Sequence, residues 1–251
     1  MSDLSHVFGI HAVRSLLRRS PQRVRRLLVD SRRDDPRIRE VIQLAQAAGI
    51  KAERSDVKAI VGRVGDVTHQ GVLADVEPIA AWQEADLLDA LTGARDPLVL
   101  LLDGVQDPHN LGACLRTADA CGAVAVVVPK DRAASMNATV RKVAAGAAET
   151  TPLVSITNLA RCMKLLKEAG LWIAGADMAG DKLAWQADLG GPLALVMGSE
   201  GEGLRELTRR NCDFLVRLPQ AGSVESLNVS VACGMLLYEA VKQRDVKTER
   251  R

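Results

Sequence analysis

The sequence predicts an α/β protein in two parts, a small α/β domain followed by a larger domain with a parallel sheet. Three observations support this prediction. Short apolar runs without alternation recur along the chain, as in strands that are covered on both faces. Amphipathic segments with helical spacing separate these runs. A stretch framed by Pro78 and Pro97 interrupts the rhythm once. We therefore expect a first domain over residues 1–75, a linker over 76–97 and a second domain over 98–251.

In the first domain, helical and strand patterns alternate. Pro36 suits the first turn of a helix, and Gly49 suits the position just past its end. The expected helices cover residues 9–19, 34–48 and 56–61, and the expected strands cover 24–29, 50–54 and 71–76. In the linker, residues 85–91 show a short helical pattern.

From residue 98 onward the pattern is a regular alternation of strand and helix. The expected strands are 98–102, 123–128, 153–156, 171–174, 193–197 and 214–218. The expected helices are 111–121, 137–148, 159–169, 204–210 and a last one that begins after Asn228. The final ten residues, KQRDVKTERR, are expected to form a frayed charged tail.

The composition is that of an ordinary globular protein, with 47% hydrophobic and 25% charged residues among 251. No apolar run approaches membrane length, and the first residues do not resemble a signal peptide. Five scattered cysteines without a CxxC pair favour reduced thiols in a cytoplasmic protein, and disfavour a zinc site or a disulfide framework.

The charge is distributed unevenly. Residues 1–75 contain 14 Lys and Arg against 9 Asp and Glu, whereas the remainder contains 19 against 22. Ten of the basic residues are arginines between Arg14 and Arg39. Arginine suits bidentate phosphate contacts, so this segment indicates either a nucleic-acid surface or simply solvated helix faces.

Three stretches combine a strand, a polar loop and a helix. In the first, a strand runs into the turn DPHN, with Asn110 expected as the helix cap and Arg116 off the apolar face of the helix. In the second, LVMGSEGEGL, a strand opens into a loop with Gly198, Gly201 and Gly203. The glycine order is GxxGxG and not GxGxxG, which disfavours a nicotinamide-dependent enzyme. In the third, Pro219 stops a strand, and a polar loop leads to a helix capped by Asn228.

Together and in this order, the three stretches closely resemble the motifs of the SpoU (TrmH) family of RNA ribose 2′-O-methyltransferases, within the SPOUT superfamily. The matching segments are NLGACLRTADACG, LVMGSEGEGL and LPQAGSVESLNVSVACGMLLYEA, and the resemblance covers about residues 98–242. Periodicity alone predicts an unknotted doubly wound sheet, but the resemblance implies a deep C-terminal trefoil knot. It also implies a homodimer with an active site near the subunit interface.

The basic first domain looks like the substrate-binding extension, similar to ribosomal protein L30e, of family members that act on large ribosomal RNA. The resemblance therefore implies 2′-O-methylation of a guanosine in 23S rRNA, in the peptidyl-transferase P-loop. A tRNA substrate and a non-catalytic RNA-binding protein are the alternatives, and the first domain is the feature that discriminates between the two RNA substrates.

The resemblance also assigns roles to individual residues. S-adenosylmethionine is the implied cofactor, held by Gly198, Leu218 and Leu227 largely through main-chain groups, with Ser226 beside them. Arg116 is the implied central catalytic residue, with Asn110, Glu200 and Asn228 around it. No metal is implied, because methyl transfer from a sulfonium to a hydroxyl needs none. A guanidinium keeps its proton at neutral pH and therefore cannot readily act as a base. We expect Arg116 instead to bind phosphate and stabilise the developing oxyanion.

Overall fold

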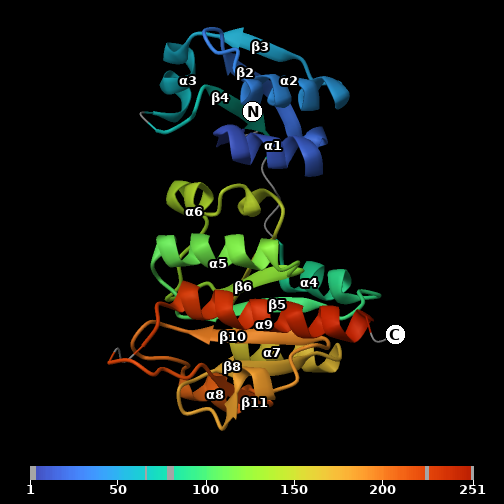
Figure 1. The fold of residues 1–251 in the computed structure, drawn as a ribbon, viewed down its shortest axis with the longest axis vertical. Helices are drawn as coiled ribbons and strands as arrows, with labels where there is room; N and C mark the ends of the chain where they lie inside the picture. Colours follow the sequence, from blue (N-terminus) through green and yellow to red (C-terminus); the bar gives the residue numbers. More distant parts are fainter. Residues whose placement is uncertain (1–3, 66, 78–81, 224–225, 250–251) are drawn as a thin grey trace. The chain divides into compact units, whose positions relative to one another are not determined.

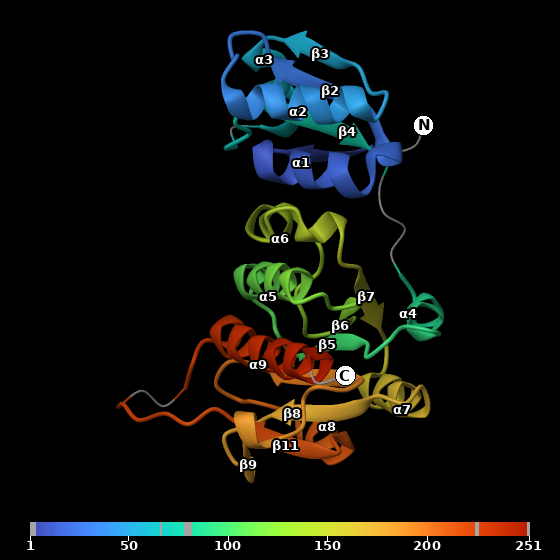
Figure 2. The ribbon, with the colours of Figure 1, turned by 45° about the vertical axis from the view of Figure 1, so that its right-hand side comes forward.

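The computed structural model describes residues 4–65, 67–77, 82–223 and 226–249, which fall into two compact units (Figures 1 and 2). The first unit is Met1–Ala80 with Ala145–Thr150, and the second is Ala81–Ala144 with Thr151–Arg251. None of the helices in these described ranges is both long and apolar enough to cross a membrane.

The first unit is a four-stranded sheet in the order β1-β4-β2-β3. Strand β4 (Val72–Val76) pairs antiparallel with β1 (Ser5–Phe8) and β2 (Val24–Asp30), and β2 pairs parallel with β3 (Ala52–Ser55). Helices α1 (Ile10–Arg19) and α2 (Pro36–Ala47) pack on one face of this sheet. Helix α3 (Val57–Val64) packs on the other.

Alternation along β2 explains these three layers. Leu27 and Val29 contribute to the core beneath α1 and α2, whereas Leu28 between them packs against Ile60 of α3. Strand β1 was not predicted, because a four-residue strand that is mostly half-buried carries little pattern.

The second unit is a seven-stranded, wholly parallel sheet in the order β7-β6-β5-β10-β8-β11-β9. Its strands are β5 (Leu98–Asp103), β6 (Ala125–Pro129), β7 (Leu153–Ile156), β8 (Trp172–Ala176), β9 (Lys182–Leu183), β10 (Leu193–Gly198) and β11 (Phe214–Arg217). Its helices are α4 (Glu84–Leu91), α5 (Pro108–Ala120), α6 (Ala138–Val143), α7 (Leu159–Glu168), α8 (Glu206–Asn211) and α9 (Val229–Glu249). The predicted α/β class with a parallel sheet is confirmed. The knot implied by the family resemblance stays a prediction.

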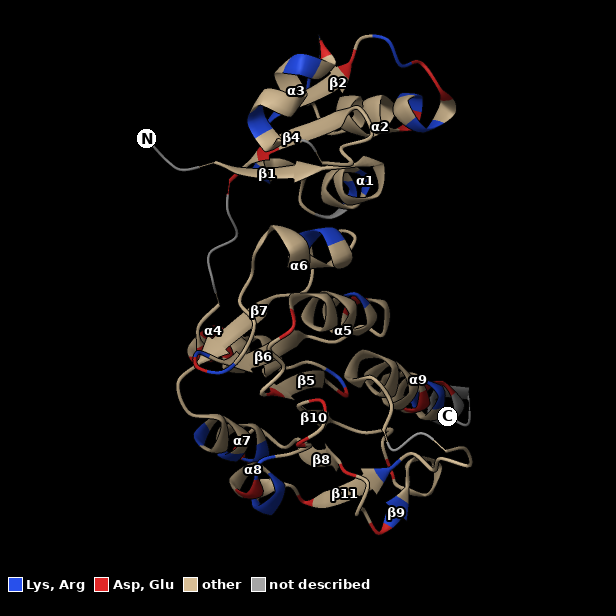
Figure 3. Cartoon of the chain, turned by 90° about the vertical axis from the view of Figure 1, so that its left-hand side faces the viewer, with Lys and Arg blue, Asp and Glu red and all other residues tan. Residues whose placement is uncertain are grey.

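Helices cover both faces of this sheet. Helices α4 and α7 bury Leu87, Met163 and Leu166 against one face, and α5 and α9 pack together on the other (Figure 3). Strands β6 and β7 extend from β5 in one direction, and β10, β8, β11 and β9 in the other. The carboxyl ends of β5 and β10 therefore lie side by side, with Gly198 opposite Asp103. Such a switch point is where open parallel sheets bind ligands.

Three local predictions were wrong. Helix α5 begins at Pro108 and is capped by Asp107, whose carboxylate accepts hydrogen bonds from the backbone of His109 and Asn110. Asn110 is therefore inside the first turn and is not the cap. The helix expected over 137–148 ends at Val143, because Ala145 and Gly146 take left-handed conformations with φ of 51° and 99°. The expected charged tail is helical as far as Glu249, since α9 continues through it.

All five cysteines are free thiols. Burial raises the pKa of both Cys162 and Cys212 to about 12. These two groups therefore stay protonated at neutral pH, as expected for unreactive structural cysteines.

Candidate functional site

Three side chains from distant parts of the sequence form one hydrogen-bonded chain at the carboxyl edge of the larger sheet. Asn228 Nδ2 donates to Asn110 Oδ1 at 2.9 Å, and Asn110 Nδ2 donates to Glu200 Oε2 at 3.3 Å. The three residues follow β11, β5 and β10 in that order. The structure thus joins the three motif segments through their polar side chains.

Asn228 has two roles in this arrangement. Its Oδ1 accepts hydrogen bonds from the backbone N–H of Ser230 at 2.9 Å and from the Ser230 hydroxyl at 2.6 Å, so it caps α9 as predicted. Its amide nitrogen is left to face Asn110. The cap therefore fixes the orientation of the same side chain that contacts the site.

The loop between β10 and α8 turns tightly around its glycines. Ser199 and Gly203 exchange backbone hydrogen bonds of 3.1 and 3.0 Å. A Cβ atom on Gly198 would lie 2.1 Å from the carbonyl carbon of Gly203, so a side chain at Gly198 would force the loop to open. Gly201 and Gly203 have φ of 89° and 69°, in the region that favours glycine.

A buried ion pair anchors the end of this loop. Asp103, at the carboxyl end of β5, has a fully buried side chain. Its carboxylate accepts from Nε of Arg205 at 2.6 Å, from the Arg205 backbone N–H at 3.2 Å and from a second guanidinium nitrogen. The end of β5 and the end of the loop after β10 are thereby tied together by a forked contact.

A cavity of about 280 Å³ opens beside this loop. The predicted cofactor-binding residues Gly198, Leu218, Ser226 and Leu227 all line it, together with Glu200. A second cavity of about 300 Å³ is lined by Asn110, Asp107 and Gly104, and it shares Ser199, Glu200, Glu202 and Val229 with the first. Glu200 therefore lines both cavities, of which the second is the more polar.

Arg116 lies apart from both cavities. It is exposed on α5 and, at 1.5 Å per residue, about 9 Å along the helix axis from Asn110. Within the described ranges, its guanidinium has no hydrogen-bond or ion-pair partner. An unoccupied, solvent-facing guanidinium is available for an anionic ligand such as phosphate.

The cavity includes residues that the sequence analysis did not predict. Asp177 and Met178 follow β8 directly, Arg209 comes from α8, and Gln220 follows Pro219 in the third motif segment. The rule that ligands lie at the carboxyl ends of parallel strands would have indicated Asp177, since it is the first residue after its strand.

The lining of the cavity fits the nucleoside of S-adenosylmethionine. Met178, Leu218, Leu227 and Leu236 supply apolar surface for an aromatic base. Three buried polar atoms on the same lining, Asp177 Oδ2, Arg209 Nε and Gln220 Oε1, have no hydrogen-bond partner in the described part of the chain. Buried polar atoms of this kind are normally satisfied, so their position favours a polar ligand between apolar walls.

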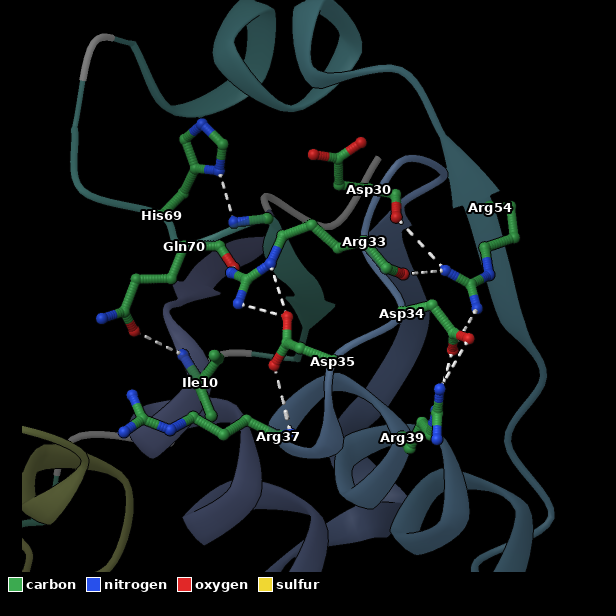
Figure 4. A network of polar contacts seen from close by, with 11 residues as sticks. Ile10, Asp30, Arg33, Asp34, Asp35, Arg37, Arg39, Arg54, His69 and Gln70 are labelled. Atoms are coloured by element: carbon green, nitrogen blue, oxygen red, sulfur yellow. Dashed lines mark hydrogen bonds and ion pairs between the residues drawn. The ribbon is translucent and has the colours of Figure 1, made fainter.

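The arginine-rich segment of the first unit is extensively ion-paired. Among the arginine side chains that the structure describes between Arg14 and Arg39, eight contact carboxylates: Arg14 and Arg18 with Glu40, Arg23 with Glu149, Arg25 with Glu77, Arg26 with Glu53, Arg32 with Asp56, Arg33 with Asp35, and Arg39 with Asp34. Figure 4 shows the guanidinium groups of Arg33, Arg39 and Arg54 gathered around Asp34 and Asp35.

These pairs persist at neutral pH. The hydrogen bond from Arg39 holds the pKa of Asp34 below its ordinary value, and the hydrogen bond from Arg26 does the same for Glu53. The positive charge of these eight arginines is therefore largely balanced by carboxylates of the same unit.

Comparisons with known proteins agree with this geometry. The sequence model of the SpoU rRNA Methylase family matches residues 97–238, and that of the RNA 2′-O ribose methyltransferase substrate-binding domain matches residues 6–82. The 23S rRNA (guanosine-2′-O-)-methyltransferase RlmB of Pseudomonas syringae pv. tomato is 52% identical over 253 residues, covering 98% of this chain and 99% of the relative. The enzyme of the same name from Escherichia coli K12 is 49% identical, covering 97% and 100%.

A solved structure is also similar. The SpoU methyltransferase AviRb from Streptomyces viridochromogenes, in complex with the cofactor AdoMet, aligns with a TM-score of 0.75 at 28% identity. The alignment covers 96% of this chain and 91% of that protein.

Proposed function

This chain belongs to the SpoU rRNA methylase family, and we propose that it transfers a methyl group from S-adenosylmethionine to the ribose 2′-hydroxyl of a guanosine in 23S rRNA. The observation that carries the proposal is the hydrogen-bonded chain of Asn228, Asn110 and Glu200 beside a cavity lined by Gly198 and Leu218. Near-identical length and about 50% identity to enzymes named for this reaction support it.

When bound, S-adenosylmethionine supplies an electrophilic methyl group. In the transfer the carbon–sulfur bond would break as the carbon–oxygen bond forms, with the sulfur leaving as a neutral thioether and the 2′-hydroxyl proton passing to water. Gly198, Leu218 and Leu227 would hold the cofactor, with Ser226 beside them on the lining of the cavity. The arrangement acts mainly by placing the hydroxyl in line with the methyl group, a contribution worth several kcal/mol in such reactions.

Arg116 binds the phosphate next to the target ribose and stabilises the negative charge that develops on the 2′-oxygen. Its free guanidinium supports this role, because a paired arginine would first have to leave its partner. Asn110, Glu200 and Asn228 orient the groups around the ribose through their mutual hydrogen bonds. Such a mechanism needs no metal.

The first unit is the RNA substrate-binding domain in this proposal, and residues 76–97 are the linker to the catalytic domain. The match to the substrate-binding family over residues 6–82 supports this division. We further propose that the modified guanosine lies in the peptidyl-transferase P-loop. Because ribosomal RNA is the substrate, we expect the protein to act in the cytoplasm.

The active form is proposed to be a homodimer. Val231, Met235 and Tyr238 are 51%, 50% and 68% exposed on α9, at spacings that place them on one side of the helix. An exposed apolar stripe beside the site is suited to a second copy of the chain. A dimer through this face would also bring another subunit close to Arg116, because α5 and α9 pack together.

Transfer of labelled methyl groups tests the proposed reaction. We expect 23S rRNA to accept label from S-adenosylmethionine, and nuclease digestion to yield 2′-O-methylguanosine, while tRNA remains unlabelled. Deleting residues 1–75 should abolish labelling of rRNA and leave cofactor binding intact. Labelling of tRNA would favour the tRNA-modifying alternative. RNA binding with no heat on calorimetric titration with S-adenosylmethionine would favour a non-catalytic protein.

A further inference from the structure

Asp177 is a buried carboxylate at the edge of the proposed cofactor cavity. Its side chain is 7% exposed, although it lines the cavity. The Asp177 backbone N–H donates to the carbonyl of Val216 in β11 at 2.9 Å, and its Oδ1 accepts from the backbone N–H of Ala179 at 2.8 Å. The main chain of Asp177 is therefore held to β11, and the backbone N–H of Ala179 orients its carboxylate.

The second carboxylate oxygen has no hydrogen-bond donor among the described residues. Its neighbour is Nη2 of Arg209 at 2.7 Å, which forms an ion pair without hydrogen-bond geometry, and Nε of Arg209 is likewise without a partner. A buried carboxylate oxygen without a donor is unfavourable by an amount comparable to a lost charged hydrogen bond. A donor supplied by the ligand in the cavity would remove this cost.

The charges around Asp177 indicate which donor suits it. Arg209 already balances the carboxylate, and a second cation placed on Oδ2 would be repelled by the guanidinium. A neutral donor such as a hydroxyl group has no such penalty. Carboxylates at the ends of parallel strands recurrently accept hydrogen bonds from the ribose hydroxyls of nucleotide cofactors.

We propose that Asp177 is a cofactor-binding residue whose Oδ2 accepts a hydrogen bond from the ribose hydroxyls of S-adenosylmethionine. The inference rests on the proposed cofactor. It adds a polar side-chain contact to a site that otherwise holds the cofactor through main-chain groups and apolar surface. Arg209 balances the negative charge of this carboxylate.

Isothermal titration calorimetry on the full chain tests this contact with two ligands, 5′-methylthioadenosine and its 2′,3′-dideoxy analogue. The wild type should bind the dideoxy analogue about tenfold or more weakly, the loss expected for one hydrogen bond to a charged group. Asp177→Ala should bind 5′-methylthioadenosine more weakly by a similar factor and should no longer distinguish the two ligands. Asp181→Ala, in the same connection between β8 and β9 but exposed, is the matched control and should behave as the wild type does.

Equal binding of both ligands by the wild type would overturn the proposal without reference to any variant. Retained discrimination in Asp177→Ala, or in Asp177→Leu if the alanine variant does not fold, would also overturn it, because neither side chain can accept a hydrogen bond. A third ligand, an analogue of 5′-methylthioadenosine without the adenine amino group, tests another contact. If the wild type bound this analogue more weakly and Asp177→Ala did not, Asp177 would contact adenine and not ribose, which would contradict the assignment. Failure of the wild type to bind S-adenosylmethionine at all would instead contradict the proposed function.

Discussion

At the scale of single residues, replacing Arg116 should slow methyl transfer without changing cofactor binding. Because it lies outside both cavities and has an unoccupied guanidinium, Arg116→Ala should leave the dissociation constant for S-adenosylmethionine unchanged. Turnover on rRNA should fall by about 100-fold or more, the usual effect of removing a donor to a developing oxyanion. Single-turnover methyl transfer and calorimetry on the same preparation measure the two effects.

Arg116→Lys is the stricter form of the same prediction. Lysine keeps the charge but not the planar fork that grips phosphate at two points. Turnover should therefore remain low. Near-full activity of the lysine variant with unchanged cofactor binding would show that the fork is not needed and that the assigned role is wrong.

Asn228 should matter for both stability and catalysis, because its amide caps α9 and contacts Asn110 at once. Asn228→Ala should lower the free energy of unfolding by about 1 kcal/mol as a cap. It should also lower turnover per folded molecule by about fivefold or more, which corresponds to one hydrogen bond of about 1 kcal/mol. Urea denaturation and methyl transfer measure the two losses.

Asn158 provides the matched control for this variant. It caps α7 through the backbone N–H of Arg161 and is exposed, with no contact to the site residues. Asn158→Ala should lose a similar amount of stability and keep its turnover. If Asn228→Ala behaved in the same way, its role would be that of a cap alone.

The sequence indicated which residues matter more reliably than what each of them does. Asn110 was expected to cap its helix, but Asp107 followed by Pro108 is the stronger helix start, because proline suits the first turn and aspartate satisfies its free N–H groups. The contact of Asn110 with Glu200, 90 residues away along the chain, depends on strand order. Local pattern does not determine that order.

At the scale of elements, the glycine loop after β10 should tolerate no side chain at its first position. A methyl group at Gly198 would overlap the backbone of Gly203. Gly198→Ala should therefore weaken cofactor binding by more than about tenfold and destabilise the protein by about 1–3 kcal/mol, as overpacking does. Calorimetry and thermal unfolding report the two changes.

Gly191, just before β10, is the control for this substitution. A Cβ atom there would meet nothing within 4 Å. Gly191→Ala should leave the cofactor affinity unchanged. Equal affinity of the Gly198→Ala and Gly191→Ala variants for S-adenosylmethionine would contradict the assignment of this loop to the cofactor site.

Most strands of the larger sheet could be predicted because they are buried on both faces and read as continuous apolar runs, such as Leu98–Asp103 and Leu193–Gly198. Strands β1 and β9 were missed for the opposite reason, since they are short and partly exposed. The break after Val143 was also missed, because left-handed conformations at Ala145 and Gly146 leave only one glycine as a signal.

At the scale of the whole molecule, the apolar stripe on α9 predicts the oligomeric state. The wild type should sediment as a dimer, and Met235→Lys combined with Tyr238→Glu should sediment as a monomer. Leu207→Lys, which places a charge at a residue that is 63% exposed on α8, should remain dimeric. A monomeric wild type, or a dimeric double variant, in analytical ultracentrifugation would contradict a dimer through this face.

The arrangement of the chain in space was the least predictable property. Periodicity indicated a parallel sheet but not its strand order, β7-β6-β5-β10-β8-β11-β9. That order depends on which strand edges and helix faces pack together, and apolar runs of similar length do not distinguish one order from another. The family resemblance, through its motifs, placed Asn110, Glu200 and Asn228 in one site, where the structure joins them by hydrogen bonds. The knot was likewise implied by that resemblance and by no local pattern.

Ribose-methylation mapping of 23S rRNA tests the central claim most directly, in cells that lack this protein and in the same cells supplied with the wild type or Arg116→Ala. The account predicts that one guanosine of the peptidyl-transferase P-loop loses its 2′-O-methyl group without the protein. The wild type should restore the methyl group, and the arginine variant should not. An unchanged methylation pattern in cells without the protein would contradict the account.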